Sequence, residues 1–283
     1  MRRVGWLLLA AILGLCAGST RGSKSAEVTP TGLELAETRA SFLDARKASE
    51  VYANIVAVLA GFALTSLILV VSVAATTRPP AETHVRLAYS TGLVGAGFIG
   101  CILAAFVLAA LAAESAVVPH LYRSLIFIGV VIAVSATAFL AALEALAVSY
   151  VPDVAAVFVL VCGLSPVLAS VCVAAPFIDA ARMVGASEVG ATTIAKQSVV
   201  ASFAPMVVAL AVRLAGGPLV VSDRSLVIGL ASIHLVAIAV FTLMAAAASM
   251  PRDRSNGGPR PSDVVGSCLA IGTLAAVVLA TLP

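Results

Sequence analysis

The sequence predicts an all-α, polytopic helical membrane protein with seven transmembrane helices plus an N-terminal signal or anchor helix. Of its 283 residues, 61% are hydrophobic and only 11% are charged. A helix needs about 20 apolar residues to cross the hydrocarbon core, and lipid offers no hydrogen-bond partner to an irregular backbone. Seven stretches of 16 to 27 residues contain no Asp, Glu, Lys or Arg: Val51–Thr77, Leu87–Ala113, Ser124–Leu143, Val154–Ile178, Gln197–Val212, Ser225–Pro251 and Val264–Pro283.

The pattern within these stretches excludes the competing fold classes. A helix of a soluble protein keeps one polar face, whereas these stretches are apolar all round. The strict in-out alternation of a membrane barrel strand is also missing. The tyrosines add a separate indication, because all of them fall at boundaries of the stretches, where an amphipathic ring prefers the headgroup layer. They are Tyr52, Tyr89, Tyr122 and Tyr150.

Residues 1–20 have the layout of a signal peptide or of a first anchor helix. Arg2 and Arg3 precede the apolar run Val4–Thr20, and a candidate cleavage site follows Ala17-Gly18-Ser19. Cleavage at that site would place the next segment outside the cell. An uncleaved helix would leave the same segment in the cytoplasm.

The distribution of basic residues favours the uncleaved helix. Counted in alternate loops, eleven Lys and Arg lie on the side of residues 21–50 and four lie on the other side. The positive-inside rule therefore places residues 21–50 in the cytoplasm and the chain in the cell membrane. Gln197–Val212 is the segment that could fail to span, because it is short and contains Pro205. Cleavage of residues 1–20 stays as the alternative.

Residues 21–50 are predicted to be an amphipathic juxtamembrane segment. Leu33–Glu50 mixes apolar and charged residues and contains no Gly or Pro, so it reads as a helix that continues into the first long stretch. Thr31 and Glu34 have the spacing of a capping box at its start. Two roles stay open for this helix: a cytosolic coupling or interface-lying element, and a solvated lead-in to the membrane.

The remaining chain divides into two membrane regions. Residues 51–178 are predicted to hold four helices and residues 197–283 to hold three, with a polar loop and a short surface helix at 179–196. The loop before the last helix is basic and suits anionic lipid headgroups. The net charge of +3 follows from this topology, so the predicted surroundings are the lipid bilayer and not nucleic acid.

Small residues at four-residue spacing indicate where helices pack, because they let backbones approach closely in lipid. Gly92, Ala96 and Gly100 form such a seam on the second long stretch, and Gly61 belongs to one on the first. Seams of this kind join helices within one chain, copies of one chain, or different membrane subunits. We therefore keep homo-oligomers and other membrane subunits as candidate partners.

Two ionisable residues of the predicted membrane helices are the candidate functional residues. Glu144 directly follows the third stretch, toward the end of the third helix, and His234 lies about ten residues into the sixth stretch. A charge in lipid is costly, so an intramembrane ionisable group is a functional candidate by default. As a pair they would form a proton or cation permeation relay if their helices touch. The alternative for His234 is a neutral imidazole bonded to a nearby carbonyl.

The sequence gives no indication of an enzyme, a cofactor or a metal site. It contains no zinc-protease, phosphate-loop or nucleophile-elbow motif. Its five cysteines lie within apolar runs without the paired spacing of metal ligands, and they read as small buried hydrophobes.

Residues 45–175 are similar to a known channel family. The stretch Ala45-Arg46-Lys47-Ala48-Ser49, followed by Leu59-Ala60-Gly61-Phe62-Ala63-Leu64, resembles the first, pore-lining helix of the Orai calcium channels and its basic cytosolic extension. The resemblance implies a channel. Orai channels have four membrane helices, however, and their acidic selectivity position falls here on Leu69, which offers no oxygen ligand to calcium. Calcium selectivity is therefore not carried over.

The near absence of polar groups in the membrane favours a non-enzymatic scaffold or accessory subunit that acts through helix packing. The alternative is an ion channel or small transporter that uses Glu144, His234 and the proline breaks in its helices. Co-purification of a stable partner would favour the first reading, and proton- or cation-dependent flux the second. A membrane-embedded enzyme is the third and weakest reading.

Overall fold

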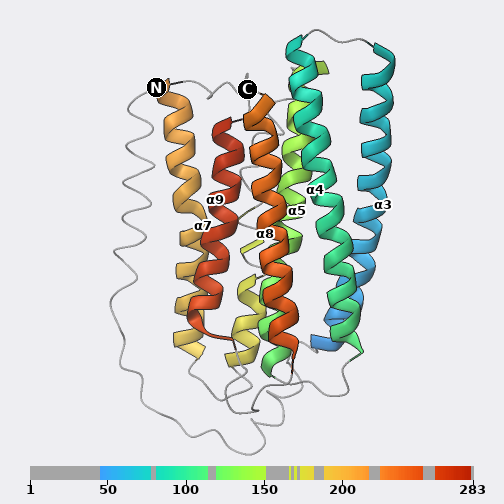
Figure 1. Ribbon diagram of the computed structural model, residues 1–283. Coiled ribbons are helices and arrows are strands. Elements are labelled where there is room, and N and C mark those ends of the chain that lie inside the picture. Colours follow the sequence, from blue (N-terminus) through green and yellow to red (C-terminus); the bar gives the residue numbers. More distant parts are fainter. Residues whose placement is uncertain are drawn as a thin grey trace, which may run out of the picture.

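The computed structural model describes residues 45–77, 81–113, 119–150, 166, 169–170, 173–181, 188–216, 224–250 and 259–281. Nearly all of these residues are helical, and none of them is in a strand. The six long helices are α3 (Ala45–Thr77), α4 (Ala81–Ala112), α5 (Pro119–Tyr150), α7 (Glu188–Gly216), α8 (Arg224–Ser249) and α9 (Pro261–Thr281) (Figure 1). Residues 173–181 form a further short helix.

All six long helices are long and apolar enough to cross a membrane. The fold is therefore all-helical, as the sequence predicted, and its helices suit a lipid bilayer. The predicted number of seven spans plus an anchor is not confirmed. Residues 1–44 lie outside the described part of the chain, and so does most of the predicted span Val154–Ile178.

The predicted span Gln197–Val212 is part of a longer helix. α7 begins at Glu188, so helix covers the second half of the predicted polar loop, and the span-like portion runs from Gly190 to Ala211. Pro205 lies inside α7 and does not end it. A proline removes one backbone hydrogen bond from a helix but leaves the flanking turns intact when neighbouring helices support them.

The helices run up and down in a bundle that has one basic end. α3, α5, α7 and α9 start at the lower end in Figure 1, whereas α4 and α8 end there. The lower end therefore collects Arg46, Lys47, Arg123, Lys196 and Arg260, and the opposite end collects Arg86, Arg213 and Arg224. These are the same two groups that the sequence separates into alternate loops. We call the lower end the basic end.

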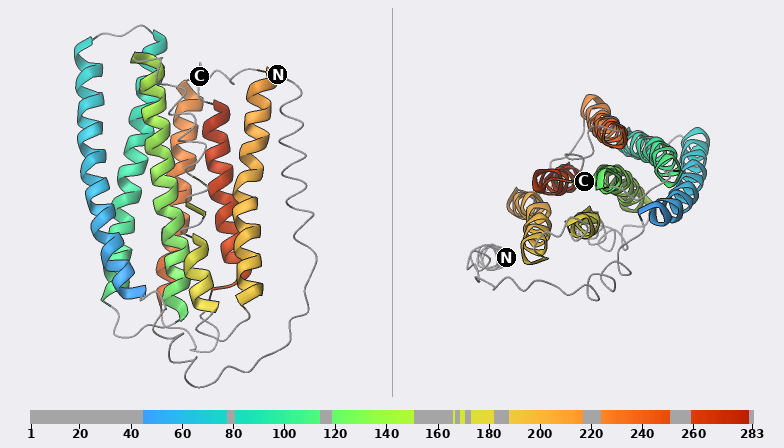
Figure 2. Two further views of the ribbon diagram at one scale, coloured as in Figure 1. Left: turned by 180° about the vertical axis from the view of Figure 1, so that it is seen from behind. Right: turned by 90° about the horizontal axis from the view of Figure 1, so that it is seen from below.

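α5 is the central helix of the bundle, and α3 is an outer one. Within the span-like windows, 72% of the α5 residues are buried, against 22% for α3. α5 packs against α4, α8 and α9, whereas α3 packs mainly on α4, and α7 packs on α9. Figure 2, seen from below, shows α5 inside the bundle and α3 at its edge. The hydrophobic core accordingly follows α5 along its length.

The tyrosines do not all lie at the surface as their boundary positions suggested. Tyr52 is 40% exposed, but Tyr89 and Tyr122 are buried. The reason is that α4 and α5 begin several residues before these tyrosines, so both rings already lie on turns that pack against neighbouring helices. The side chain of Tyr150 lies outside the description.

Candidate functional site

Glu144 lies in a closely packed part of α5, near the end of the bundle opposite the basic end. Its side chain is completely buried. The adjacent Ala145 belongs to a core cluster that also contains Tyr89 of α4, Leu230 of α8 and Val278 of α9. One turn or less away, the Ser90 hydroxyl on α4 shares its proton between the carbonyl oxygens of Arg86 on its own helix, at 2.9 Å, and Ala142 on α5, at 3.2 Å. The turn of α5 that carries Glu144 therefore lies where four helices meet.

His234 is the second buried ionisable residue, and it lies on α8. Its Nδ1 is 2.9 Å from the carbonyl oxygen of Leu230, one turn earlier. A carbonyl can only accept a hydrogen bond, so Nδ1 carries the proton, and Nε2 of the neutral ring is an acceptor. Nε2 is buried and has no hydrogen-bond partner among the residues that the structure describes. The hydrogen bond from Nδ1 to the carbonyl oxygen of Leu230 is the one expected if His234 is a neutral imidazole.

The glycine seam of α4 lies against α8 and α5, on both sides of His234. A Cβ atom at Gly92 would lie 3.1 Å from Cβ of Ala231, and one at Gly100 would meet Ser135 Oγ and, at 3.0 Å, Ile238. His234 is three residues after Ala231 and four before Ile238, so it shares their face of α8. Extending this register places it opposite Ala96, which is 1% exposed.

Gly61 is placed differently from the seam on α4. It lies on the outer face of α3, where a Cβ atom would have nothing within 4 Å. Ala57 and Thr65, one turn to each side of Gly61, are exposed as well. The structure thus uses Gly92, Ala96 and Gly100 for contacts inside the bundle and leaves the seam around Gly61 uncovered.

The register between α5 and α8 puts Glu144 and His234 at different heights. The Phe127 and Phe241 rings are 6.4 Å apart near the basic end, and the two helices run antiparallel. Extending that register places His234 opposite the neighbourhood of Ser135, nine residues before Glu144 and about 13 Å away along the helix axis. No hydrogen bond joins the imidazole to Glu144, since Nε2 has no partner in the described residues. A relay between them stays a prediction that would need an intermediate group.

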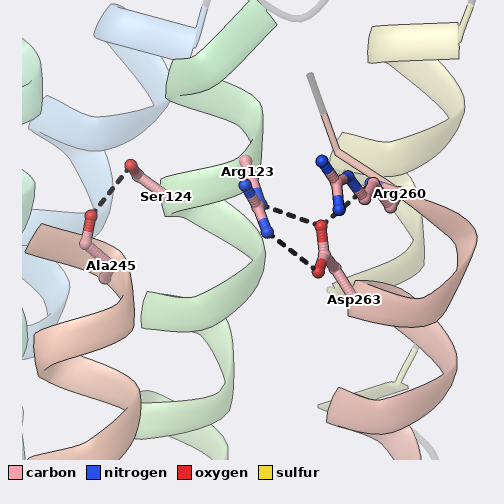
Figure 3. A network of polar contacts seen from close by, with 5 residues as sticks. All are labelled: Arg123, Ser124, Ala245, Arg260 and Asp263. Carbon is pink, nitrogen blue, oxygen red and sulfur yellow. Dashed lines mark hydrogen bonds and ion pairs between the residues drawn. The ribbon is translucent and has the colours of Figure 1, made fainter. Parts of the chain in front are cut away.

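A polar cluster at the basic end was not foreseen as a site. Arg123 on α5 donates hydrogen bonds of 2.9 and 3.3 Å to the two carboxylate oxygens of Asp263 on α9 (Figure 3). Asp263 also accepts a 2.9 Å hydrogen bond from the backbone N–H of Arg260, which caps the start of α9. The guanidinium carbon of Arg123 lies 5.7 Å from the centre of the Phe127 ring, within the range of a cation–π contact.

The signal for half of this cluster was present in the sequence. A proline at the first position of a helix and an acidic residue at the third are typical of a capped N-terminus, and Pro261 and Asp263 fit that pattern. The partner was not readable, because Arg123 and Asp263 are separated by 140 positions in the chain. In the sequence, Arg123 is recognisable only as one of the eleven basic residues on the side of residues 21–50.

A second close contact joins α9 to α7. A Cβ atom at Gly272 would collide with the backbone carbonyl group of Ser202, three residues before Pro205. Backbone therefore meets backbone at this crossing. Contacts of this kind are common between membrane helices with small residues at their interface.

Two apolar clefts lie on the side of the bundle between α3, α4 and α5. The cleft nearer the basic end has a volume of about 340 Å³, and the other has about 310 Å³. Ile132 and Ala136 line both of them, so the two clefts adjoin. They open because α3 packs on α4 and touches α5 much less.

The described residues contain no cluster of three or more His, Cys, Asp or Glu side chains placed to hold a metal ion. Cys101 and Cys268 are buried free thiols on α4 and α9. The other three cysteines lie outside the described residues.

Comparison with protein-family models, with curated proteins and with solved structures finds no match for this chain. The resemblance of residues 45–175 to Orai channels therefore stays a prediction. In the structure, the stretch that carries it forms most of α3, and Leu69, at the position of the family's selectivity acid, is 64% exposed on that helix.

Proposed function

We propose that this protein is a non-enzymatic membrane scaffold or accessory subunit, which holds a firmly packed helix bundle and offers its outer helix α3 to a neighbouring membrane helix. One observation carries the proposal: among the described residues, the glycine seam of α4 is filled inside the bundle, whereas nothing covers the seam around Gly61 on α3.

Polar or close packing contacts join the inner helices at three levels along the bundle, and such a rigid bundle suits a scaffold. At the basic end Arg123 binds Asp263, and Ser124 donates a 3.0 Å hydrogen bond to the carbonyl oxygen of Ala245 (Figure 3). The seam around Gly100 packs at mid-height, and Ser90 bonds α5 near the opposite end. Each buried hydrogen bond contributes about 1 kcal/mol, and the close backbone contacts add dispersion energy.

The outer face of α3 has the features of a helix–helix interface. Ala57, Gly61 and Thr65 follow one another at four-residue spacing, and Phe62 and Leu69 beside them are 68% and 64% exposed. Small residues at that spacing let a second helix approach closely, and the flanking large side chains fit over it. The neighbouring helix would belong to a second copy of the chain or to another membrane subunit.

Substitution of Gly61 tests the proposal. Gly61→Leu would block a close approach from outside without disturbing the described part of the chain, where no atom lies within 4 Å of the new Cβ. Gly266→Leu is the matched control, since Gly266 is also exposed with nothing within 4 Å, but on α9. Subunit counting by single-molecule photobleaching in lipid bilayers should show association weakened about tenfold by Gly61→Leu and unchanged by the control.

Co-purification from native membranes extends the same comparison to other subunits. A partner that wild type and Gly266→Leu retain, and that Gly61→Leu loses, would identify the neighbour of α3. Equal association and equal partners for all three proteins would contradict the proposal.

A proton or cation channel or small transporter is the second candidate. It is favoured by the complete burial of Glu144 and His234 inside helices that could span a membrane. It is also favoured by Nε2 of His234, which has no hydrogen-bond partner among the described residues. Proton and cation flux into liposomes should be compared for wild type, Glu144→Gln and His234→Ala. Wild-type flux that falls in either variant would favour permeation, whereas a silent, correctly folded wild type would favour the scaffold.

A further inference from the structure

We propose that the cleft nearer the basic end is a binding site for one anionic phospholipid, with an acyl chain in the cleft and the phosphate group at Arg46. The cleft is built by α3, α4 and α5, and residues 169 and 176 close it from the side. This inference does not depend on whether the bundle acts as a scaffold or conducts ions.

The lining of the cleft suits a hydrocarbon chain. Among the described residues that line it, Tyr52 alone is polar, and the rest are aliphatic or small, among them Ile55, Val56, Leu125 and Ala136. The Tyr52 hydroxyl can stay at the mouth, because this side chain is 40% exposed. Because α3 makes few contacts with α5, an acyl chain in the cleft would supply the missing dispersion contacts between the two helices.

The length of the cleft matches one leaflet of a bilayer. Along α5 it extends from Leu125 to Ala136, eleven residues or about 16 Å of helix rise. The hydrocarbon core of a bilayer is about 30 Å thick, so one acyl chain occupies about half of it. The cleft thus begins at the basic end and stops near the middle of the membrane.

A permanent positive charge lies just beyond the mouth. Arg46 is six residues before Tyr52, about 9 Å along α3, which corresponds to the depth of the headgroup layer. Arg46, Ser49, Ala53 and Val56 follow one another at steps of three or four residues, so they lie on one face of α3. Val56 lines the cleft and lies about 80° around the helix from Arg46, so Arg46 is positioned at the edge of the groove, on the side of Val56.

The charges around Arg46 favour an anion. Arg46 and the exposed Lys47 next to it carry two positive charges, against one negative charge on the exposed Glu50, which lies one turn after Arg46. The guanidinium group offers a planar fork of donors that matches a phosphate, and basic residues near a membrane surface attract anionic lipids. Both the chain and the headgroup of one lipid would therefore be recognised.

Native mass spectrometry of the purified protein with phosphatidylglycerol or phosphatidylcholine of identical acyl chains provides the test. Wild type should retain one phosphatidylglycerol at least tenfold more strongly than phosphatidylcholine. Arg46→Gln should lose most of that preference, because it removes a hydrogen bond between charged groups. The matched control Lys47→Gln should lower it by no more than about fivefold, the value of one nearby surface charge.

A second pair of variants tests the cleft itself. Ala136→Phe fills the inner end of the cleft and should reduce retention of both lipids, whereas Ala239→Phe on the exposed face of α8 should not. Equal retention of the two lipids by wild type, or full retention of phosphatidylglycerol by folded Ala136→Phe, would overturn the proposal.

A cross-linking measurement keeps the proposal testable if Ala136→Phe does not fold. Ile55 and Val58 are 49% and 59% exposed, but only Ile55 lines the cleft. A photoreactive phenylalanine analogue at position 55 should cross-link to phosphatidylglycerol in nanodiscs, and much less in nanodiscs of phosphatidylcholine. At position 58 the yield should be the same in both. Equal yields at position 55 as well would contradict a specific site.

Discussion

Arg123 donates two hydrogen bonds to the carboxylate of Asp263, so the central helix α5 is joined to α9 at the basic end of the bundle. The carboxylate also accepts the backbone N–H of Arg260. One acidic side chain therefore caps α9 and fixes it to α5 at the same time. Because Asp263 is only 10% exposed, this ion pair is less screened by water than a pair at an open surface.

Replacing Asp263 by Asn should lower the free energy of unfolding by about 1–2 kcal/mol, since the charge that binds Arg123 and caps α9 is lost while the size is kept. Reversible unfolding in mixed detergent micelles, followed by circular dichroism, measures this change. Arg260→Gln is the control, because only the backbone of Arg260 takes part, and it should change stability little. A double-mutant cycle of Asp263→Asn with Arg123→Gln that showed no coupling would refute the assignment.

Gly100→Ala should destabilise the bundle by about 1–3 kcal/mol, the usual cost of overpacking a tight contact. The added methyl group meets Ser135 Oγ, which donates a 2.8 Å hydrogen bond to the carbonyl oxygen of Val131 and cannot move without weakening it. Gly95→Ala, five residues earlier on the same helix, meets nothing within 4 Å among the described residues and should be neutral or stabilising by up to about 1 kcal/mol. The same unfolding assay measures the free energy of unfolding of both variants. Equal effects of the two substitutions would show that the seam is not tightly packed.

His234→Leu should leave the free energy of unfolding within about 1 kcal/mol of wild type. The substitution removes a buried Nε2 that has no partner in the described residues, and replacing such a group by an apolar one is often neutral or stabilising. Ile238→Ala, one turn further on α8 and 1% exposed, should cost about 2–4 kcal/mol because it leaves a cavity. A large loss for His234→Leu would mean that the imidazole makes a further contact through residues outside the described part of the chain.

The general architecture could be predicted from the sequence because lipid imposes a simple rule. Long uncharged stretches must be helices, and helices joined by short connections alternate in direction, so the grouping of Arg46, Lys47, Arg123 and Arg260 at one end followed from counting loops. The helix starts were harder to predict. α7 begins at Glu188 because polar residues such as Lys196 and Gln197 can continue a helix while they stay exposed, and the boundaries of uncharged runs do not mark its ends.

The candidate site was predictable only in part. Glu144 and His234 could be identified because an ionisable group in lipid is costly. Gly92 and Gly100 could be identified from the spacing of small residues. Neither signal depends on which residues lie next to them. Which residue meets which depends on helix register across the bundle, and a single sequence carries little information on register. For the same reason Gly61 and Gly100 have similar sequence surroundings, although one faces outward and the other contacts Ser135.

The basic end should lie in the cytoplasm, because Lys and Arg near membrane helices are retained on that side. Lys47→Cys reports on the basic end and Thr76→Cys on the opposite end, since both positions are exposed. In a background without the other cysteines, a membrane-impermeant maleimide should label Thr76→Cys in intact cells and Lys47→Cys only after permeabilisation. The reverse pattern would place residues 21–50 outside the cell, which is the arrangement that cleavage after Ser19 would produce. Labelling of both in intact cells would instead indicate that α3 does not cross the membrane.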